Sequence, residues 1–277
     1  MSAPPRSVAQ TFAERRPAPA LAAHVTCVWV QRVAVASAPY LHRTVPNGSA
    51  ELRCALGAPP RVAGPQTGPT EEVLPAGTTV VGVRLRPGAA EAVFGVPAAE
   101  LVDQDLEVGA LWGAHAAELG ETLTAAGSPE SAARRLHDAV AGRLADGPAL
   151  DPVAAEVVAR LLPRLGAGLR VGSLASSLFI SERQLRRRCD AAIGLAPKAL
   201  HRMVRFQRFL ALAGTLPRPS EQLARLAAEA GYADQSHLTR ESLRLAGRSP
   251  RTVLRQAETD CGCRHDHAAS YGPLLQG

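Results

Sequence analysis

Residues 171–255 repeat one helical pattern, and this duplication constrains the fold of the chain more than any other feature. The first copy runs from Leu174-Ala175 to Leu185, and the second runs from Leu226-Ala227 to Leu238. The two alanines are 52 residues apart and the two leucines are 53 apart, so the second turn is one residue longer. A small residue where two helices approach, a short turn and a polar cap before the next helix are typical of a helix-turn-helix unit.

The second helix of each unit has its own start signal, Ser181 in the first and Asp234 in the second. After Ser181, the residues Leu185, Cys189 and Ile193 recur at helical spacing and so are expected to face inward. The opposite face of that helix carries three guanidinium groups, those of Arg183, Arg186 and Arg187. We therefore expect this helix to present a basic surface.

Further residues in this region occur at the spacing found in one family of helix-turn-helix proteins. They are Arg205, Gly194 with Pro197, Gly231-Tyr232, residues 234–240 and Gly247-Arg248-Ser249-Pro250. With these positions, residues 165–257, roughly a third of the chain, resemble the DNA-binding domain of the AraC family of bacterial transcription regulators. The chain departs from the family at Cys189 and Ser242, where Phe is usual, and at Leu243, where a basic residue is frequent.

The resemblance implies a regulator that binds double-stranded DNA with the second helix of each unit. The first turns of such a recognition helix enter the major groove, where one bidentate arginine–guanine pair contributes roughly 1 to 3 kcal/mol of base discrimination. Hydroxyl and amide side chains suit phosphates as readily as bases. On an ordinary soluble helix the same residues would only be solvated. Here we expect DNA contacts from Arg183, Gln184, Arg186, Arg187, Gln235, Ser236, His237, Thr239 and Arg240.

Residues 197–213 predict one helix between the two units. Its expected buried residues are Met203, Val204, Phe206, Phe209 and Leu210. This helix would fix the span between the recognition helices, which matters because successive major grooves on one side of a duplex lie about 34 Å apart. Arg205 and Arg248 are expected to be structural or to contact the DNA backbone, and Arg188 to do either.

Charge is divided unevenly along the 277 residues. Residues 150–257 hold 18 Arg and Lys against 8 Asp and Glu, whereas residues 1–149 hold 12 against 14. A polyanionic partner is therefore expected for the C-terminal half only. With no run of 18 apolar residues and no signal-type core in residues 1–19, we expect a cytoplasmic protein without a membrane partner.

The N-terminal half resembles a different part of the same family. The segment 83–90, with Phe94-Gly95-Val96-Pro97 and Leu101, is similar to the N-terminal domain in one branch of AraC-type regulators. In the wider family such domains are often cupin-like barrels that bind an effector or dimerise. The resemblance implies control by a small-molecule effector, RNA polymerase as a partner, and a homodimer. The expected fold class is α+β, with a β-rich, cupin-like N-terminal domain and an all-α double helix-turn-helix domain.

Local patterns place the elements of that β-rich domain. Residues 24–35 and 78–86 predict strands, the first with Val25, Cys27 and Trp29 on one face. Pro46-Asn47-Gly48 predicts a hairpin turn between residues 42–45 and 50–56. Residues 59–72 are expected to be a loop, and residues 89–94 a short helix.

Two further helices are expected between the domains, because Ser128-Pro129 and Asp151-Pro152 are helix start signals. Their apolar stripes indicate packing within the chain or, alternatively, a dimer seam. Gly166-Ala167-Gly168 is expected to be a hinge. The predicted division is residues 1–125 for the sensor, 126–165 for linking helices with a dimerisation role, 166–257 for the DNA-binding domain and 258–277 for a tail.

The tail places two thiols and two imidazoles within seven residues, namely Cys261, Cys263, His265 and His267. Their alternation puts all four on one side of an extended chain, and these groups are ligands for soft metals such as zinc or copper. The alternatives are a disordered extension, which we favour, and a metal- or thiol-responsive regulator. The chain has five cysteines, and disulfides are not expected in a reducing compartment. No other cofactor is indicated.

An enzyme is not indicated. A catalytic cupin requires a histidine pair and a carboxylate on strands, whereas His24 and His42 are isolated and His115 and His137 fall on predicted helices. No Gly-x-Ser-x-Gly nucleophile motif occurs, and the reactive-cysteine signature of a DNA-repair alkyltransferase is absent. The sequence favours an activator no more than a repressor.

Overall fold

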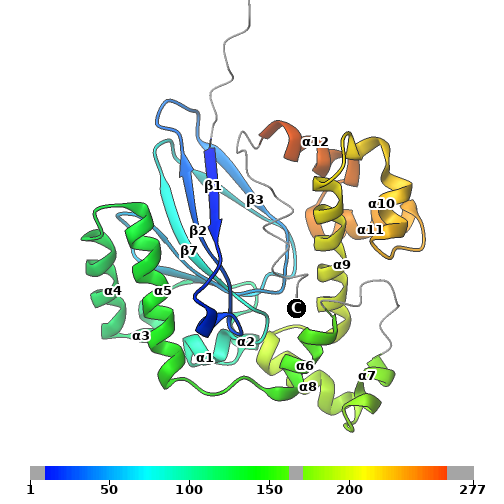
Figure 1. Cartoon of the computed structure of the whole chain (residues 1–277), viewed down its shortest axis with the longest axis horizontal. Coiled ribbons are helices and arrows are strands. Elements are labelled where there is room, and N and C mark those ends of the chain that lie inside the picture. Colours follow the sequence, from blue (N-terminus) through cyan, green and yellow to red (C-terminus); the bar gives the residue numbers. More distant parts are fainter. Residues whose placement is uncertain (1–9, 162–170, 261–277) are drawn as a thin grey trace, which may run out of the picture.

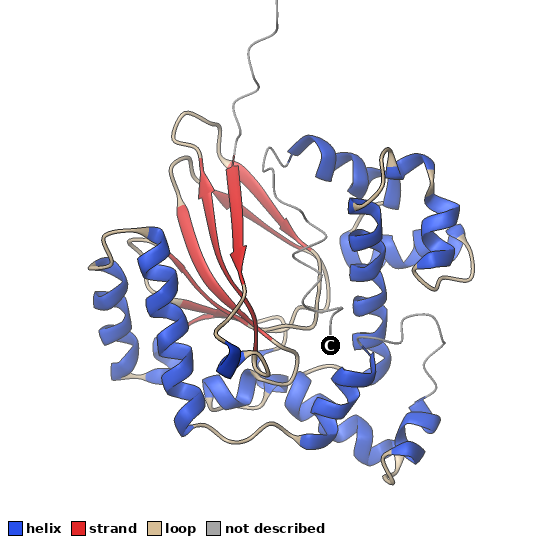
Figure 2. Ribbon diagram, viewed as in Figure 1, coloured by secondary structure: helices blue, strands red, loops and turns tan. Residues whose placement is uncertain are grey.

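The computed structural model describes residues 10–161 and 171–260. It consists of a β-rich N-terminal domain and a helical C-terminal domain (Figure 1). Figure 2 shows the strands confined to the N-terminal part. The expected α+β fold class is confirmed.

A six-stranded antiparallel sheet, of order β1-β2-β7-β4-β5-β8, forms the centre of the N-terminal domain. Its strands are β1 (Gln10–Arg15), β2 (Val25–Val33), β4 (Glu51–Ala55), β5 (Arg61–Ala63), β7 (Thr79–Leu85) and β8 (Asp105–Glu107). A separate ladder pairs β3 (Tyr40–Thr44) with β6 (Thr70–Leu74). A short 3-10 helix, Pro19–Leu21, lies between β1 and β2.

Helices cover one face of the sheet. They are α1 (Ala90–Phe94), α2 (Ala98–Leu101), α3 (Gly109–Trp112), α4 (Ala114–Thr124) and α5 (Pro129–Asp146). Helix α5 packs on β2 and β7, and its Leu136 and Val140 are fully buried with Val83 of the sheet. As predicted, Ser128 caps this helix, accepting a hydrogen bond from the Ser131 backbone N–H. The apolar stripe of α5 is thus buried within its own chain.

The face assignment of Val25 was wrong. Strict alternation groups it with Cys27 and Trp29, but the pairing of β2 with β7 shifts register between Val25 and Cys27. Such an extra residue, a β-bulge, moves the preceding side chains to the other face. Val25 therefore joins Val28 in the core beneath the helices, while Cys27 and Trp29 face the β3–β6 ladder.

The predicted hairpin was also wrong, although its turn exists. Gly48 has a φ of +78°, and Asn47 Oδ1 accepts a hydrogen bond from the Ser49 backbone N–H at 2.9 Å. The strands on either side do not pair with each other, because β3 pairs with β6 and β4 with β5 and β7. The segment expected to be a loop, residues 59–72, contains β5 and the start of β6.

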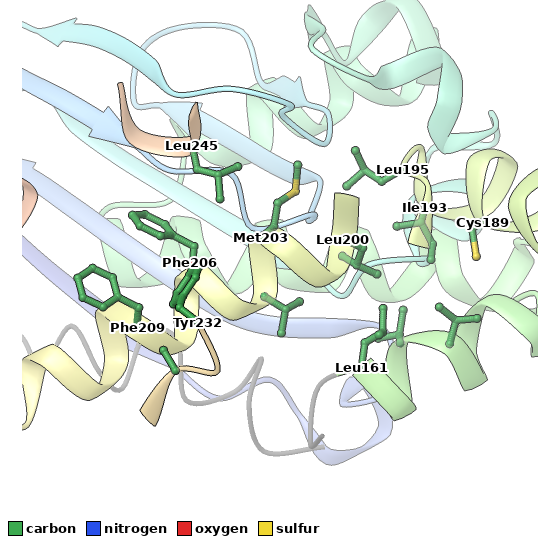
Figure 3. Packing of buried hydrophobic residues seen from close by; sticks show 14 of the residues in the cluster. Leu161, Cys189, Ile193, Leu195, Leu200, Met203, Phe206, Phe209, Tyr232 and Leu245 are labelled. Atoms are coloured by element: carbon green, nitrogen blue, oxygen red, sulfur yellow. The ribbon is translucent and has the colours of Figure 1, made fainter. Parts of the chain in front are cut away.

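The C-terminal domain has one core shared by both helix-turn-helix units. Its helices are α6 (Pro152–Leu161), α7 (Val171–Ser177), α8 (Glu182–Ile193), α9 (Pro197–Gly214), α10 (Leu223–Glu229), α11 (Gln235–Ala246) and α12 (Pro250–Asp260), with a 3-10 turn at Pro219–Glu221. Phe206 and Phe209 of α9 are fully buried in this core (Figure 3). Of the expected buried residues of α9, only Leu210 is half-buried rather than buried.

Helix α6 belongs to the C-terminal domain. Asp151 Oδ1 caps it by accepting hydrogen bonds from the Val153 and Ala154 backbone N–H groups at 2.8 and 2.9 Å. Val157 and Leu161 are buried in the same core as α8 and α9. The predicted hinge, Gly166-Ala167-Gly168, lies outside the described residues. In the part of the chain that is described, no helix is long and apolar enough to cross a bilayer.

Candidate nucleic-acid interface

A capping box starts the first recognition helix, α8. Ser181 Oγ accepts a hydrogen bond from the Gln184 backbone N–H at 3.2 Å, and Gln184 Oε1 accepts one from the Ser181 backbone N–H at 2.9 Å. These bonds satisfy donors that have no partner inside the helix. The side chain of Gln184, expected to contact DNA, thus also holds the end of its own helix.

The outer face of α8 is basic, as expected. An open hollow is lined by Arg183, Gln184, Arg186, Arg187, Asp190 and Ala196. Arg186 lies 3.3 Å from Glu182, one turn earlier, and both side chains remain exposed. Neither Arg183 nor Arg187 has an ion-pair partner among the residues that the structure describes. Both guanidinium groups are exposed on the outer face of α8.

Arg188 has a different role from its neighbours. Its Nε atom lies 3.2 Å from Asp151 Oδ2, and Asp151 also caps α6. Arg188 therefore ties α8 to α6.

The second recognition helix, α11, begins at the predicted cap. Asp234 Oδ1 accepts a hydrogen bond from the His237 backbone N–H at 2.6 Å. Gln235, Ser236 and Arg240 are exposed, whereas Thr239 is half-buried and its hydroxyl donates to the Gln235 carbonyl at 2.9 Å. The exposed face of α11 therefore offers an amide, a hydroxyl and one guanidinium group near its start.

His237 takes part in a cluster that faces α9. The Arg205 guanidinium lies 4.4 Å from the centre of the Tyr232 ring, and the His237 ring meets that ring edge-on with centroids 5.2 Å apart. Arg205 Nη2 is 3.4 Å from His237 Nε2. Burial raises the pKa of Tyr232 above its usual range. Arg205 therefore has a packing role within the domain, and His237 helps to hold α11 against α9.

The exposed face of α11 carries a further basic residue, Arg244, that was not among the expected DNA contacts. Arg244 is exposed and follows Arg240 by one helical turn, so the two lie on the same stripe. The spacing of four residues was the signal that could have identified it.

Two of the three departures from the family pattern, Ser242 and Cys189, have local explanations, whereas Leu243 is exposed. Ser242 is fully buried, and its hydroxyl donates to the Arg248 carbonyl at 2.6 Å, which closes the turn after α11. Cys189 fills a core position in α8.

Comparison with known families decides what these helices are. Residues 174–256 match the model of a helix-turn-helix domain, and residues 13–107 match that of a domain of unknown function, DUF6597. The C-terminal domain is an AraC-type helix-turn-helix domain. A chain with an AraC-type domain of this kind is a DNA-binding transcription regulator.

Solved structures with a similar chain trace include ToxT from Vibrio cholerae O395, at 12% identity over 79% of this chain and 94% of that one, with a TM-score of 0.44. A second crystal form of ToxT gives 11% identity, 88% and 98% coverage and a TM-score of 0.47. A DNA-binding transcriptional dual regulator from Escherichia coli K-12 gives 19% identity, 40% and 98% coverage and a TM-score of 0.34. No curated protein matches the sequence.

The N-terminal domain has a second polar cluster, between the sheet and the β3–β6 ladder. Arg84 Nε lies 2.6 Å from Glu51 Oε1, and Arg84 Nη1 lies 3.2 Å from Glu14 Oε1. Burial lowers the pKa of His42, whose Nδ1 atom is 3.3 Å from Gln31 Nε2. The inner face of this sheet, which faces the ladder, therefore carries polar groups beside an apolar cluster, whereas the helix-covered face is apolar.

The described cysteines are poor candidates for sensing. Cys27, Cys54 and Cys189 are all buried. Burial raises the pKa of Cys54 to about 11 and that of Cys189 to about 12, and it raises the pKa of Cys27 further, so these thiols stay protonated near neutral pH. No group of metal ligands occurs among the residues that the structure describes. The four tail residues predicted to bind metal, Cys261, Cys263, His265 and His267, lie outside that part of the chain.

Proposed function

We propose that this regulator recognises a specific duplex sequence with α8 and α11, and that its N-terminal domain controls this binding in response to a small molecule. The observation that carries the first part is the exposed basic face of α8. Arg183 and Arg187 project from the first turns of a recognition helix, which are the turns that enter the major groove.

The arrangement around α9 supports simultaneous binding by both helices. Helix α9 lies between the two units in Figure 1 and spans 18 residues, which at about 1.5 Å per residue gives a rigid rod of about 27 Å. The second unit packs directly on α9, and the first is connected to it through α6, which contacts both α8 and α9. All of these helices share one core. A rigid spacer of this size holds the recognition helices at a fixed separation, which suits two successive major grooves.

A duplex selection tests this binding. The full chain is incubated with random duplexes, the bound ones are enriched, and affinity for the enriched sequence is measured across salt concentrations. We expect a defined sequence to emerge and log K to fall by about 0.9 per phosphate contact for each unit of log salt. No enrichment, or an affinity that salt leaves unchanged, would contradict the proposal.

Control by the N-terminal domain is supported by its contacts with the DNA-binding domain. Gln207 of α9 is buried, and its side-chain amide donates to the Pro46 carbonyl at 2.9 Å and the Val45 carbonyl at 3.3 Å. Arg248, just after α11, lies 2.9 Å from Glu71 of β6. The β3–β6 ladder therefore contacts the second unit directly.

The same ladder also lines the polar inner face. Glu72 lies 2.7 Å from Arg53 of the main sheet, while its neighbour Glu71 faces the DNA-binding domain. A molecule that displaced Glu72 or His42 from the inner face of the ladder would also move β6, whose Glu71 binds Arg248 on the opposite face. A ligand shifts such an equilibrium only by its preference for one of the two states.

Trp29 offers a direct readout of effector binding. It is buried on the inner face, and its indole N–H has no hydrogen-bond partner among the described atoms. We expect compounds that change Trp29 fluorescence also to change the affinity for the selected duplex. Trp29→Phe assigns the signal, since Trp112 is the other tryptophan. Compounds that alter Trp29 fluorescence and leave DNA affinity unchanged would contradict effector control.

A further inference from the structure

One aromatic side chain in the first helix-turn-helix unit is strained and exposed. Phe179 lies in the turn between α7 and α8 with a φ of +55°, and its side chain is 96% exposed. A bulky residue in this left-handed conformation is an outlier. Because the ring is in solvent, burial does not offset that strain.

The second unit has the same turn conformation, but a glycine adopts it there without strain. Gly231 has a φ of +83° and precedes the buried Tyr232, just as Phe179 precedes the half-buried Ile180. Glycine adopts this conformation at no steric cost. The fold therefore requires a positive φ at this point of the turn but not a phenyl ring, so the ring at Phe179 needs another explanation.

The position of Phe179 indicates its partner. It lies two residues before Ser181, the N-cap of α8. Phe179 is therefore close to the N-terminal end of α8, and the first turns of a recognition helix are the ones that enter the groove. In the sequence, Phe179 precedes Arg183 of the basic face by four residues. An apolar group beside that face meets the wall of the groove, where deoxyribose carbons and thymine methyl groups are the apolar surfaces.

We propose that Phe179 is a DNA-contacting residue, which packs its ring on apolar atoms of the duplex at the edge of the groove occupied by α8. This inference rests on the proposed DNA binding by α8. Phe179 adds an uncharged contact to the electrostatic contacts of its arginine neighbours. On this proposal, the phenylalanine lowers the stability of the turn but contributes to DNA binding.

The test compares Phe179→Gly with the wild-type protein on a duplex selected by the wild-type full chain. We expect Phe179→Gly to bind that duplex about five- to tenfold more weakly. The melting temperature of this variant should rise by about 2 °C, because glycine relieves the backbone strain. The slope of log K against log salt should not change, since no phosphate contact is lost.

Two further variants sharpen the test. Phe179→Tyr keeps the ring and is expected to keep the affinity to within about twofold. Val35→Ser removes another exposed apolar side chain, 85% exposed and in the N-terminal domain, and is expected to leave binding unchanged. Replacing thymines in the duplex by deoxyuridine separates the two surfaces: a loss with wild type but not with Phe179→Gly identifies a methyl contact, and equal binding identifies the sugars.

Three results would overturn the inference: unchanged affinity of Phe179→Gly, a lower melting temperature in that variant, or a changed salt slope. Equal weakening by Phe179→Tyr would do the same. If the wild-type chain enriches no duplex, the proposed function fails and this inference fails with it. If it does enrich one and Phe179→Gly binds it as tightly, only the inference fails.

Discussion

The two helix-turn-helix units have the same design and different surfaces. Each begins its recognition helix at a side-chain cap, and each buries a leucine, Leu185 or Leu238, at the equivalent position of its unit. Outside the core they diverge, because α8 exposes three guanidinium groups, whereas α11 exposes an amide, a hydroxyl and two arginines one helical turn apart.

The units also differ in what holds them. The second is braced by Arg205 and Tyr232 and is joined to the N-terminal domain through Arg248. The first has a strained turn at Phe179 and two arginines without an ion-pair partner among the described residues. Both units contact the N-terminal domain, the first because α8 packs on α1 and α2. The exposed arginines still indicate a division of labour, in which the first unit supplies most of the DNA affinity.

The largest effect is expected from Arg187→Ala in the first unit. The exposed guanidinium lies in the first turns of α8, so its loss should weaken binding to the selected duplex at least tenfold and leave the fold intact. A gel-shift titration measures this, with Arg134→Ala on α5 as the matched control. Unchanged affinity would remove Arg187 from the interface.

The caps provide a comparison that does not depend on DNA. Ser181→Ala and Asp234→Ala each remove the side chain that accepts the backbone N–H of the third residue of a recognition helix, which costs about 1 kcal/mol of the free energy of unfolding. Denaturant titration should show similar losses for both. A loss confined to one variant would show that the two caps are not equivalent.

A smaller effect on binding is expected from Arg240→Ala in the second unit. We expect about a threefold loss, since Arg240 has one arginine neighbour, Arg244, whereas Arg187 belongs to a group of three exposed arginines. If Arg240→Ala costs more affinity than Arg187→Ala, the proposed division of labour is reversed.

The smallest effect is expected at the contact between the domains. The Arg248–Glu71 pair is partly exposed, and such pairs contribute at most about 1 kcal/mol. Glu71→Ala should free Arg248 and the second unit, raising the affinity for the selected duplex about twofold. Glu121→Ala on α4 is the control for the change in net charge. Weaker binding by Glu71→Ala would mean that the contact positions the second unit for DNA.

The helical part of the fold was predictable because its signals are local. Ser128, Asp151, Ser181 and Asp234 were each identified from their own neighbourhood, and all four cap helices in the structure. Strand pairing depends on distant partners, so the turn at Gly48 was correctly placed while its strands were wrongly paired.

The candidate site was predictable in outline for a similar reason. Helical periodicity separates outer from inner residues, which placed Arg183 and Arg187 correctly on the outside. It could not show that His237 turns toward Tyr232, because that contact depends on how α11 packs against α9. Neither could it reveal the strain at Phe179, which is a property of the backbone.

The most direct test of the account is a footprint of the full chain on its selected duplex, with guanine methylation interference on both strands. Two recognition helices at a fixed separation predict two protected major-groove segments on one side of the duplex, centred about 10 base pairs apart. Arg187→Ala should abolish protection in one segment and Arg240→Ala should weaken the other. A single protected segment, or two on opposite sides of the duplex, would contradict the account.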